Sequence, residues 1–151
     1  MTSDQAIISI LKEQVSSYKI LLDLLKVERK SLVDIDADKI EDISKEKDTV
    51  VMRLRLLEEE RQRLISKFAG DNGVGSDITL LDLGRLTENS LIPELRSQLL
   101  SLLQSIEEMN RFNSILIDRS IQHIKTSSSF FNSFVTENTP AHTGVLLSKE
   151  T

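Results

Sequence analysis

The sequence predicts an all-α protein in which a long antiparallel helical hairpin carries a third long helix, in a bundle or coiled-coil-like arrangement. Apolar residues recur at alternating spacings of three and four, which is the period of helices that pack through one seam. The 151 residues include only two prolines and five glycines, so turn signals are rare. Aromatic residues make up 4% of the chain and hydrophobic residues 39%, so the core must be mainly aliphatic.

The first predicted helix spans residues 4–33. Its seam has a single polar member, Arg29, and comprises Ile8, Leu11, Val15, Tyr18, Leu22, Leu25, Arg29 and Leu32. The second predicted helix spans 37–69. Two cations, Lys47 and Arg61, interrupt its seam, which comprises Ile40, Ile43, Lys47, Val50, Leu54, Leu57, Arg61, Leu64 and Phe68.

The two seams are out of phase with each other, because the steps from Leu32 to Asp36 and from Asp36 to Ile40 are both four residues. A continuous helix with a stutter and a helical hairpin both explain this slip. Asp38 and Glu41 have the spacing of a capping box, which opens a helix. We therefore expect a hairpin, with the two seams facing each other.

Three glycines between residues 70 and 75 mark the clear internal boundary, and Gly70 suits the left-handed position after a helix. This stretch lacks the ligand spacing of a calcium loop and the lysine of a phosphate loop, so we interpret it as a surface loop. Residues 78–86 are expected to form a short helix weakened by Gly84, or an apolar strap on the bundle.

The third predicted helix spans residues 94–130, with Pro93 suited to its first position and Glu94 to its first turn. A main apolar row is followed, beyond Asn113, by a second row displaced by about 100° around the helix. These rows are Leu95, Leu99, Leu102, Ile106, Met109, Asn113 and Leu116, and then Ile117, Ile121 and Ile124. The surplus apolar surface predicts a partner, unless this helix is the central one of a bundle and is buried on several sides.

The charges favour the partner hypothesis. Residues 1–69 contain 27 charged side chains and residues 79–135 only 11, so the third helix largely lacks a solvated face. We expect residues 1–135 to form one helical domain. Residues 136–151, with Pro140 and Gly144, are expected to be a disordered tail.

Several function classes are disfavoured. A net charge of −5 argues against binding to nucleic acid or to an anionic membrane. The absence of cysteine excludes disulfides and thiolate metal sites, and no motif for a catalytic, metal or cofactor site surrounds His123 or His142. No signal peptide or apolar stretch long enough to span a membrane is visible, so we expect a soluble, cytoplasmic protein that is not an enzyme.

The chain resembles the FlgN family of flagellar type III export chaperones. The resemblance covers two long helices with an acidic joint at 34–38, the run 58–61, a glycine-rich break, and the spacing Asn-x-x-Asn-x-x-Leu-Ile in the third helix. It implies a chaperone that binds the C-terminal helical segments of hook-filament junction (hook-associated) proteins. Such a chaperone would escort them to the flagellar export apparatus.

The residues expected to bind the partner lie on the third helix. The resemblance supplies Asn110, Asn113, Leu116 and Ile117, and the apolar rows add Met109, Ile121 and Ile124. Leu116 and Met109 are also candidates for the core, and the two asparagines could instead set the packing register. The alternative function is a structural coiled-coil or adaptor protein that forms a homo-oligomer, and a homodimer of the free chaperone is also possible.

Overall fold

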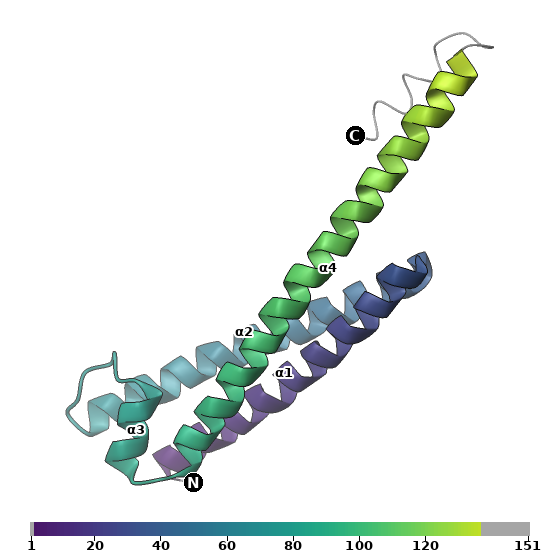
Figure 1. The fold of residues 1–151 in the computed structure, drawn as a ribbon. Coiled ribbons are helices and arrows are strands. Elements are labelled where there is room, and N and C mark those ends of the chain that lie inside the picture. Colours follow the sequence, from purple (N-terminus) through teal and green to yellow (C-terminus); the bar gives the residue numbers. More distant parts are fainter. Residues whose placement is uncertain (1, 137–151) are drawn as a thin grey trace. The chain divides into compact units, whose positions relative to one another are not determined.

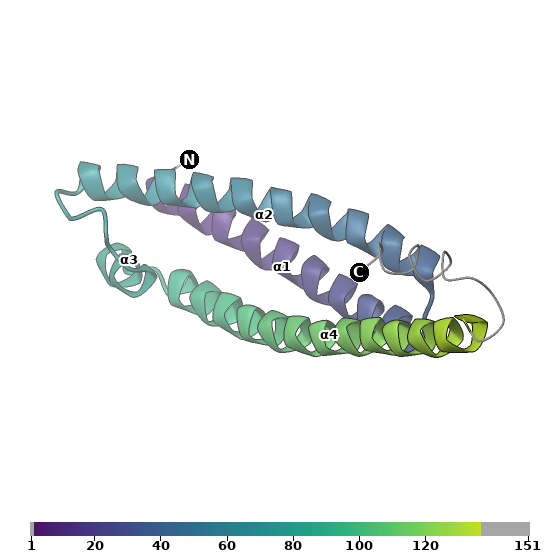
Figure 2. The same cartoon turned by 90° about the horizontal axis from the view of Figure 1, so that it is seen from above.

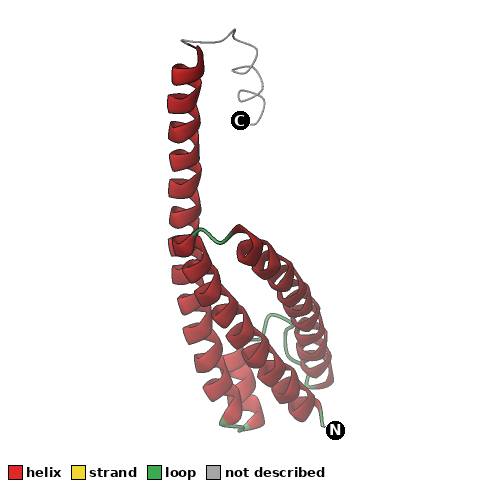
Figure 3. Cartoon of the chain, turned by 90° about the vertical axis from the view of Figure 1, so that its right-hand side faces the viewer, coloured by secondary structure: helices red, strands yellow, loops and turns green. Residues whose placement is uncertain are grey.

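The computed structural model describes residues 2–136, and every regular element within them is a helix (Figure 3). The elements are α1 (Ser3–Asp34), α2 (Ala37–Asp71), α3 (Leu80–Thr87) and α4 (Leu91–Thr136). The all-α class is therefore confirmed. The predicted tail, 136–151, lies outside the described residues except for Thr136, the last residue of α4.

Helices α1 and α2 form the expected antiparallel hairpin, running side by side in Figures 1 and 2. All but one of the residues in the two predicted seams are buried or half-buried. The exception is Arg29, the polar member of the first seam, which is exposed. The seam pattern thus predicted the hairpin and the two faces that pack together. A row of aliphatic residues along a helix is buried only when it packs against an apolar row on another helix.

The hairpin joint consists of Ile35 and Asp36. Ile35 adopts a left-handed conformation (φ 54°), so the chain reverses at once after α1. The Asp36 backbone N–H donates to the Ser31 carbonyl at 3.0 Å, and the Asp36 carboxylate accepts from the Lys39 N–H at 3.2 Å. The predicted capping box at Asp38 and Glu41 is therefore wrong: Asp36 caps α2, because a left-handed Ile35 places it directly at the helix start.

The loop after α2 also differs from the prediction. Gly70 lies inside α2, and Gly73 is the glycine with positive φ (65°). The helix runs on to Asp71 because the Asn72 and Gly73 N–H groups donate to the Phe68 and Gly70 carbonyls. Gly70 thus does not occupy the left-handed position after the helix.

Residues 80–87 form a short helix, which confirms the first of the two alternatives for residues 78–86, a short helix or an apolar strap. A capping box joins Thr79 and Asp82, whose carboxylate also accepts from the Thr79 hydroxyl at 2.8 Å. The buried Gly84 faces Pro93, and a Cβ atom at Gly84 would lie 3.0 Å from two atoms of the proline ring. Glycine here lets α3 approach the start of α4 closely.

Helix α4 is longer than predicted at both ends. It begins at Leu91, whose N–H donates to the Asn89 side chain at 3.0 Å, so Pro93 lies within the first turn and not at its first position. The missing proline N–H costs no helical hydrogen bond in that turn. At the other end the helix continues through the serines after Lys125 to Thr136.

The chain divides into two compact units, 1–113 and 114–151, with the boundary inside α4. The first unit holds α1, α2, α3 and α4 as far as Asn113. Its main aliphatic core joins the start of α1, the end of α2, α3 and the start of α4, and a smaller core surrounds Leu25. Within this unit α4 runs beside α1 (Figures 1 and 2), so α1 contacts both long neighbours. The described part of the second unit is the helix from Ser114 to Thr136.

Candidate partner-binding site on helix α4

The seven predicted contact residues all lie on α4, but the two units share them. Met109, Asn110 and Asn113 belong to the first unit, and Leu116, Ile117, Ile121 and Ile124 belong to the second. Met109 is half-buried against the core around Leu25, whereas Asn110 is exposed. The two asparagines of the quoted spacing therefore have different surroundings.

Asn113 lies in the interior of the first unit, with 2% of its surface exposed. Its Nδ2 atom donates to the Leu25 carbonyl at 3.0 Å and to Glu28 Oε1 at 2.8 Å. Glu28, itself 6% exposed, accepts from Lys47 Nζ at 2.9 Å through its other oxygen. Asn113, Glu28 and Lys47 form a polar network that connects α4, α1 and α2, and we call it the three-helix network.

This network explains a polar residue that interrupts the second seam. Lys47 reaches Glu28 across the hairpin, so its charge is compensated where the seam would otherwise hold an aliphatic side chain. Sequence reasoning missed Glu28, although a signal exists. Ile7, Gln14, Leu21 and Glu28 are spaced by seven and all are buried, so they form a second row on α1 that faces inward.

The second unit presents exposed isoleucines. Ile117 is 39% exposed and Ile121 is 45% exposed, and their spacing of four places them on one face of the helix. Leu116 is half-buried, and the side chain of Ile124 lies outside the described residues. The described part of the second unit consists of one helix, so it contains no second described element against which Ile117 and Ile121 could be buried.

Two exposed apolar residues near this region were not predicted. Phe112 is 48% exposed and Ile115 is 44% exposed. The Phe112 ring lies under the Arg29 guanidinium, 5.7 Å from the ring centre. Both residues line a hollow of about 360 Å³ between α1 and the first-unit part of α4, together with Leu22, Lys26, Ser105, Glu108 and Met109. A helical pattern alone does not indicate that Arg29 covers an aromatic ring.

A second groove in the first unit, of about 200 Å³, is lined by residues of all four helices. The lining residues are Gln14, Tyr18, Glu58, Arg61, Leu80, Arg96, Leu99, Leu100 and Leu103. Glu58 accepts hydrogen bonds from Arg61 and from Gln14, the latter at 2.8 Å. Burial raises the pKa of Glu58, but the bonds from Arg61 and Gln14 outweigh it and lower the pKa overall. Burial, and then the Glu58 charge, raise the pKa of the Tyr18 hydroxyl.

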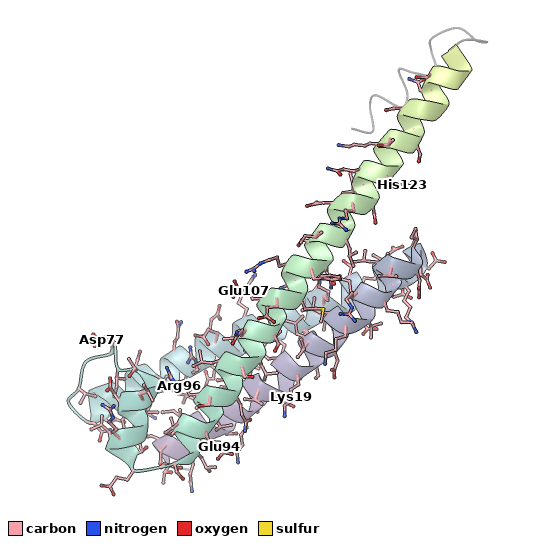
Figure 4. The ribbon with its side chains drawn as sticks, viewed as in Figure 1. Lys19, Asp77, Glu94, Arg96, Glu107 and His123 are labelled. Carbon is pink, nitrogen blue, oxygen red and sulfur yellow. The ribbon has the colours of Figure 1, made fainter. Side chains whose placement is uncertain are left out.

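His123 projects from the second-unit part of α4 (Figure 4) and is exposed. Within residues 2–136, no group of three or more histidine, aspartate or glutamate side chains is arranged to hold a metal ion. No described helix is both long and apolar enough to cross a membrane.

Comparison with known proteins identifies the family. The model of the family described as FlgN protein matches residues 1–139, which is nearly the whole chain. No curated protein and no solved structure matches the chain. The resemblance noted in the two long helices, the glycine-rich break and the asparagine spacing is thereby confirmed, and the chain belongs to the FlgN family, a family of flagellar export chaperones.

Proposed function

We propose that this chaperone binds the C-terminal helical segments of hook-associated proteins along α4, in the cytoplasm, and delivers them to the flagellar export apparatus. Residues 1–135 act as one chaperone domain in this proposal. Family membership supports the chaperone activity in general. The choice of client rests on the resemblance to the FlgN family, and the choice of surface rests on the exposed isoleucines of α4.

The exposed isoleucines of the second unit carry the proposal. Ile117 and Ile121 hold large apolar side chains in water on a helix whose charges are few. Exposed apolar surface of this kind, at helical spacing, is typical of a helix that binds the apolar face of another helix. The predicted contacts are Met109, Asn110, Asn113, Leu116, Ile117, Ile121 and Ile124.

The contact residues would make different contributions. Ile117 and Ile121 are available in the free chain, and Asn110 is exposed one turn before Asn113. Asn113 already bonds to Leu25 and Glu28, so a client could reach it only by replacing those bonds. We therefore place the energetic centre of binding at the isoleucines.

A client segment that forms an amphipathic helix on assembly exposes an apolar face before assembly. Such a face associates with other copies unless it is covered. A helix laid against Ile117 and Ile121 would bury both apolar faces at once. This reasoning accounts for a chaperone that prevents premature assembly without any catalytic step.

Replacing Ile121 by Asp tests the surface. The substitution should weaken binding of a hook-associated C-terminal peptide by about 2 kcal/mol, or roughly 30-fold, if the side chain is a buried anchor in the complex. Calorimetric titration measures this change. Ile20→Asp is the matched control, because Ile20 is 51% exposed on α1 and lies outside the proposed surface.

The melting temperature separates binding from folding. Ile121→Asp should leave the melting temperature close to that of the unchanged chain, since the side chain is exposed in the free protein. A sharp fall in melting temperature without a selective loss of binding would assign Ile121 to the fold. Equal losses of binding in the two variants would remove α4 as the specific surface.

A further inference from the structure

We propose that the exposed side of α1 docks an acidic amphipathic helix of a partner protein other than the client. The surface combines the hollow between α1 and α4 with a row of lysines that we call the basic stripe, Lys12, Lys19, Lys26 and Lys30. Lys19 is labelled in Figure 4. The whole surface belongs to the first unit and is separate from the isoleucines proposed to bind clients.

The four lysines lie on one side of α1. Steps of seven, seven and four residues, at about 100° per residue, keep them within an arc of roughly 40°. They extend along about 27 Å of the helix at about 1.5 Å per residue. All four are exposed, and none forms an ion pair with a residue that the structure describes. The row thus presents uncompensated positive charge on a chain whose net charge is −5.

The hollow of about 360 Å³ adjoins the stripe, because Lys26 is part of its lining. Its apolar lining includes Leu22 and Phe112, and Phe112 is 48% exposed. Arg29 adds a second cation, which lies over the Phe112 ring and forms no ion pair with a described carboxylate. The hollow therefore offers apolar surface to one side chain and two cations to a neighbouring carboxylate.

A helix with acidic residues seven apart matches this surface. Seven residues advance a helix by about 10.5 Å, so its carboxylates would repeat at the spacing of Lys12, Lys19 and Lys26. An apolar side chain beside them would enter the hollow. Two acidic side chains also lie near, Asp23 along α1 and Glu108 in the lining of the hollow, but five cations leave an excess of positive charge.

The same observations favour a protein helix over a nucleic acid or an anionic membrane. A long polyanion would approach much of a chain that is negative overall, which opposes its binding. An acidic helix needs only the narrow stripe. The exposed Phe112 ring also gives no advantage to a phosphate, whereas it can be covered by an apolar side chain of a helix.

The test uses a synthetic three-heptad peptide with one glutamate per heptad beside a row of leucines, titrated with the full chain by fluorescence anisotropy. Binding should weaken about tenfold between low and physiological salt, because exposed charges carry it. Lys26→Glu should weaken binding at least tenfold. Lys67→Glu is the matched control, because it makes the same change in net charge at an exposed, unpaired lysine on α2, and it should have little effect.

Two further variants locate the peptide. Phe112→Ala should weaken binding without changing its salt dependence, because it removes apolar surface and no charge. Ile121→Asp should leave binding of the acidic peptide unchanged, and Lys26→Glu should leave binding of the hook-associated peptide unchanged. Failure of this inference and failure of the proposed client site are therefore distinguished by which peptide loses its binding.

Three results would overturn the proposal. The first is an acidic peptide that does not bind the unchanged chain. The second is an equal loss of binding in Lys26→Glu and Lys67→Glu. The third is tighter binding of single-stranded RNA or of phosphatidylserine vesicles than of the peptide, with loss of that binding in Lys26→Glu, which would assign the stripe to another class of partner.

Discussion

At the scale of single residues, the polar members of the apolar seams are the most informative feature of the structure. Arg29, Lys47 and Arg61 interrupt the seams in the sequence, and each has a partner in the fold. Arg29 lies over the Phe112 ring, Lys47 bonds to Glu28, and Arg61 bonds to Glu58. The spacing of the seams shows that these residues are exceptions. It does not predict their partners, because the partners lie on other turns or on other helices.

The three-helix network gives the first prediction at this scale. Asn113→Ala removes both donated hydrogen bonds and leaves Glu28 Oε1 buried without its donor, whereas the Leu25 carbonyl keeps the helical bond that it accepts within α1. A buried acceptor that loses its partner costs roughly 1–3 kcal/mol, so we expect a loss of about 2 kcal/mol in the free energy of unfolding. Urea denaturation of the full chain measures the loss.

A double-mutant cycle checks that the loss arises from the network. Glu28→Ala removes one acceptor of Asn113 and the partner of Lys47. If the residues act together, the double variant should lose less stability than the sum of the two single losses, with a coupling of about 1 kcal/mol or more. Additive losses would show that Asn113 contributes independently of Glu28.

At the scale of elements, the sequence predicted helices better than it predicted their ends. The start of α2 at residue 37 was predicted, yet the capping residue was not, because Asp34, Asp36 and Asp38 alternate through the joint. The choice among them depends on the left-handed Ile35, and a β-branched residue gives no warning of that conformation. The end of α4 was set too early, because serine and threonine have only a weak preference against helix.

Helix α3 supplies the prediction at this scale. Gly84→Ala improves helix propensity by up to about 1 kcal/mol, but its Cβ would lie 3.0 Å from the rigid Pro93 ring. Overpacking against a rigid neighbour costs roughly 1–3 kcal/mol, so the clash wins and the free energy of unfolding should fall by about 1 kcal/mol. Thermal or urea denaturation detects this change.

Gly70 offers a matched control with the opposite sign. It lies inside α2, and a Cβ atom there would meet nothing within 4 Å. Gly70→Ala should therefore raise the free energy of unfolding by about 0.5–1 kcal/mol. If both alanine variants stabilise the chain, the close approach of α3 to Pro93 is absent in solution.

At the scale of the whole molecule, the rows on the third helix predicted exposed apolar surface correctly at Ile117 and Ile121. Asn113 belongs to the main apolar row, and a role in setting the packing register was one of its two predicted roles. Its partners, Leu25 and Glu28, were not predicted, because they depend on the register of α4 against α1, which a single helix does not encode. In the first unit, α1 is the helix that packs against neighbours on both sides. The sequence analysis gave this central position to the third helix as one alternative. The second inward-facing row of α1 was not recognised in the sequence, because two of its members, Gln14 and Glu28, are polar.

The salt and heat-capacity dependence of client binding gives the last prediction. Around the proposed surface, α4 carries few charges beyond Arg111, Asp118 and Arg119, so apolar burial should dominate. We expect calorimetry with a client C-terminal peptide to show a negative heat-capacity change and an affinity that varies little with salt. Ile121→Asp should reduce the heat-capacity change, whereas Ile20→Asp should not. A loss of about tenfold in affinity between low and physiological salt, with little heat-capacity change, would instead point to the charged hairpin between residues 34 and 63 as the docking face.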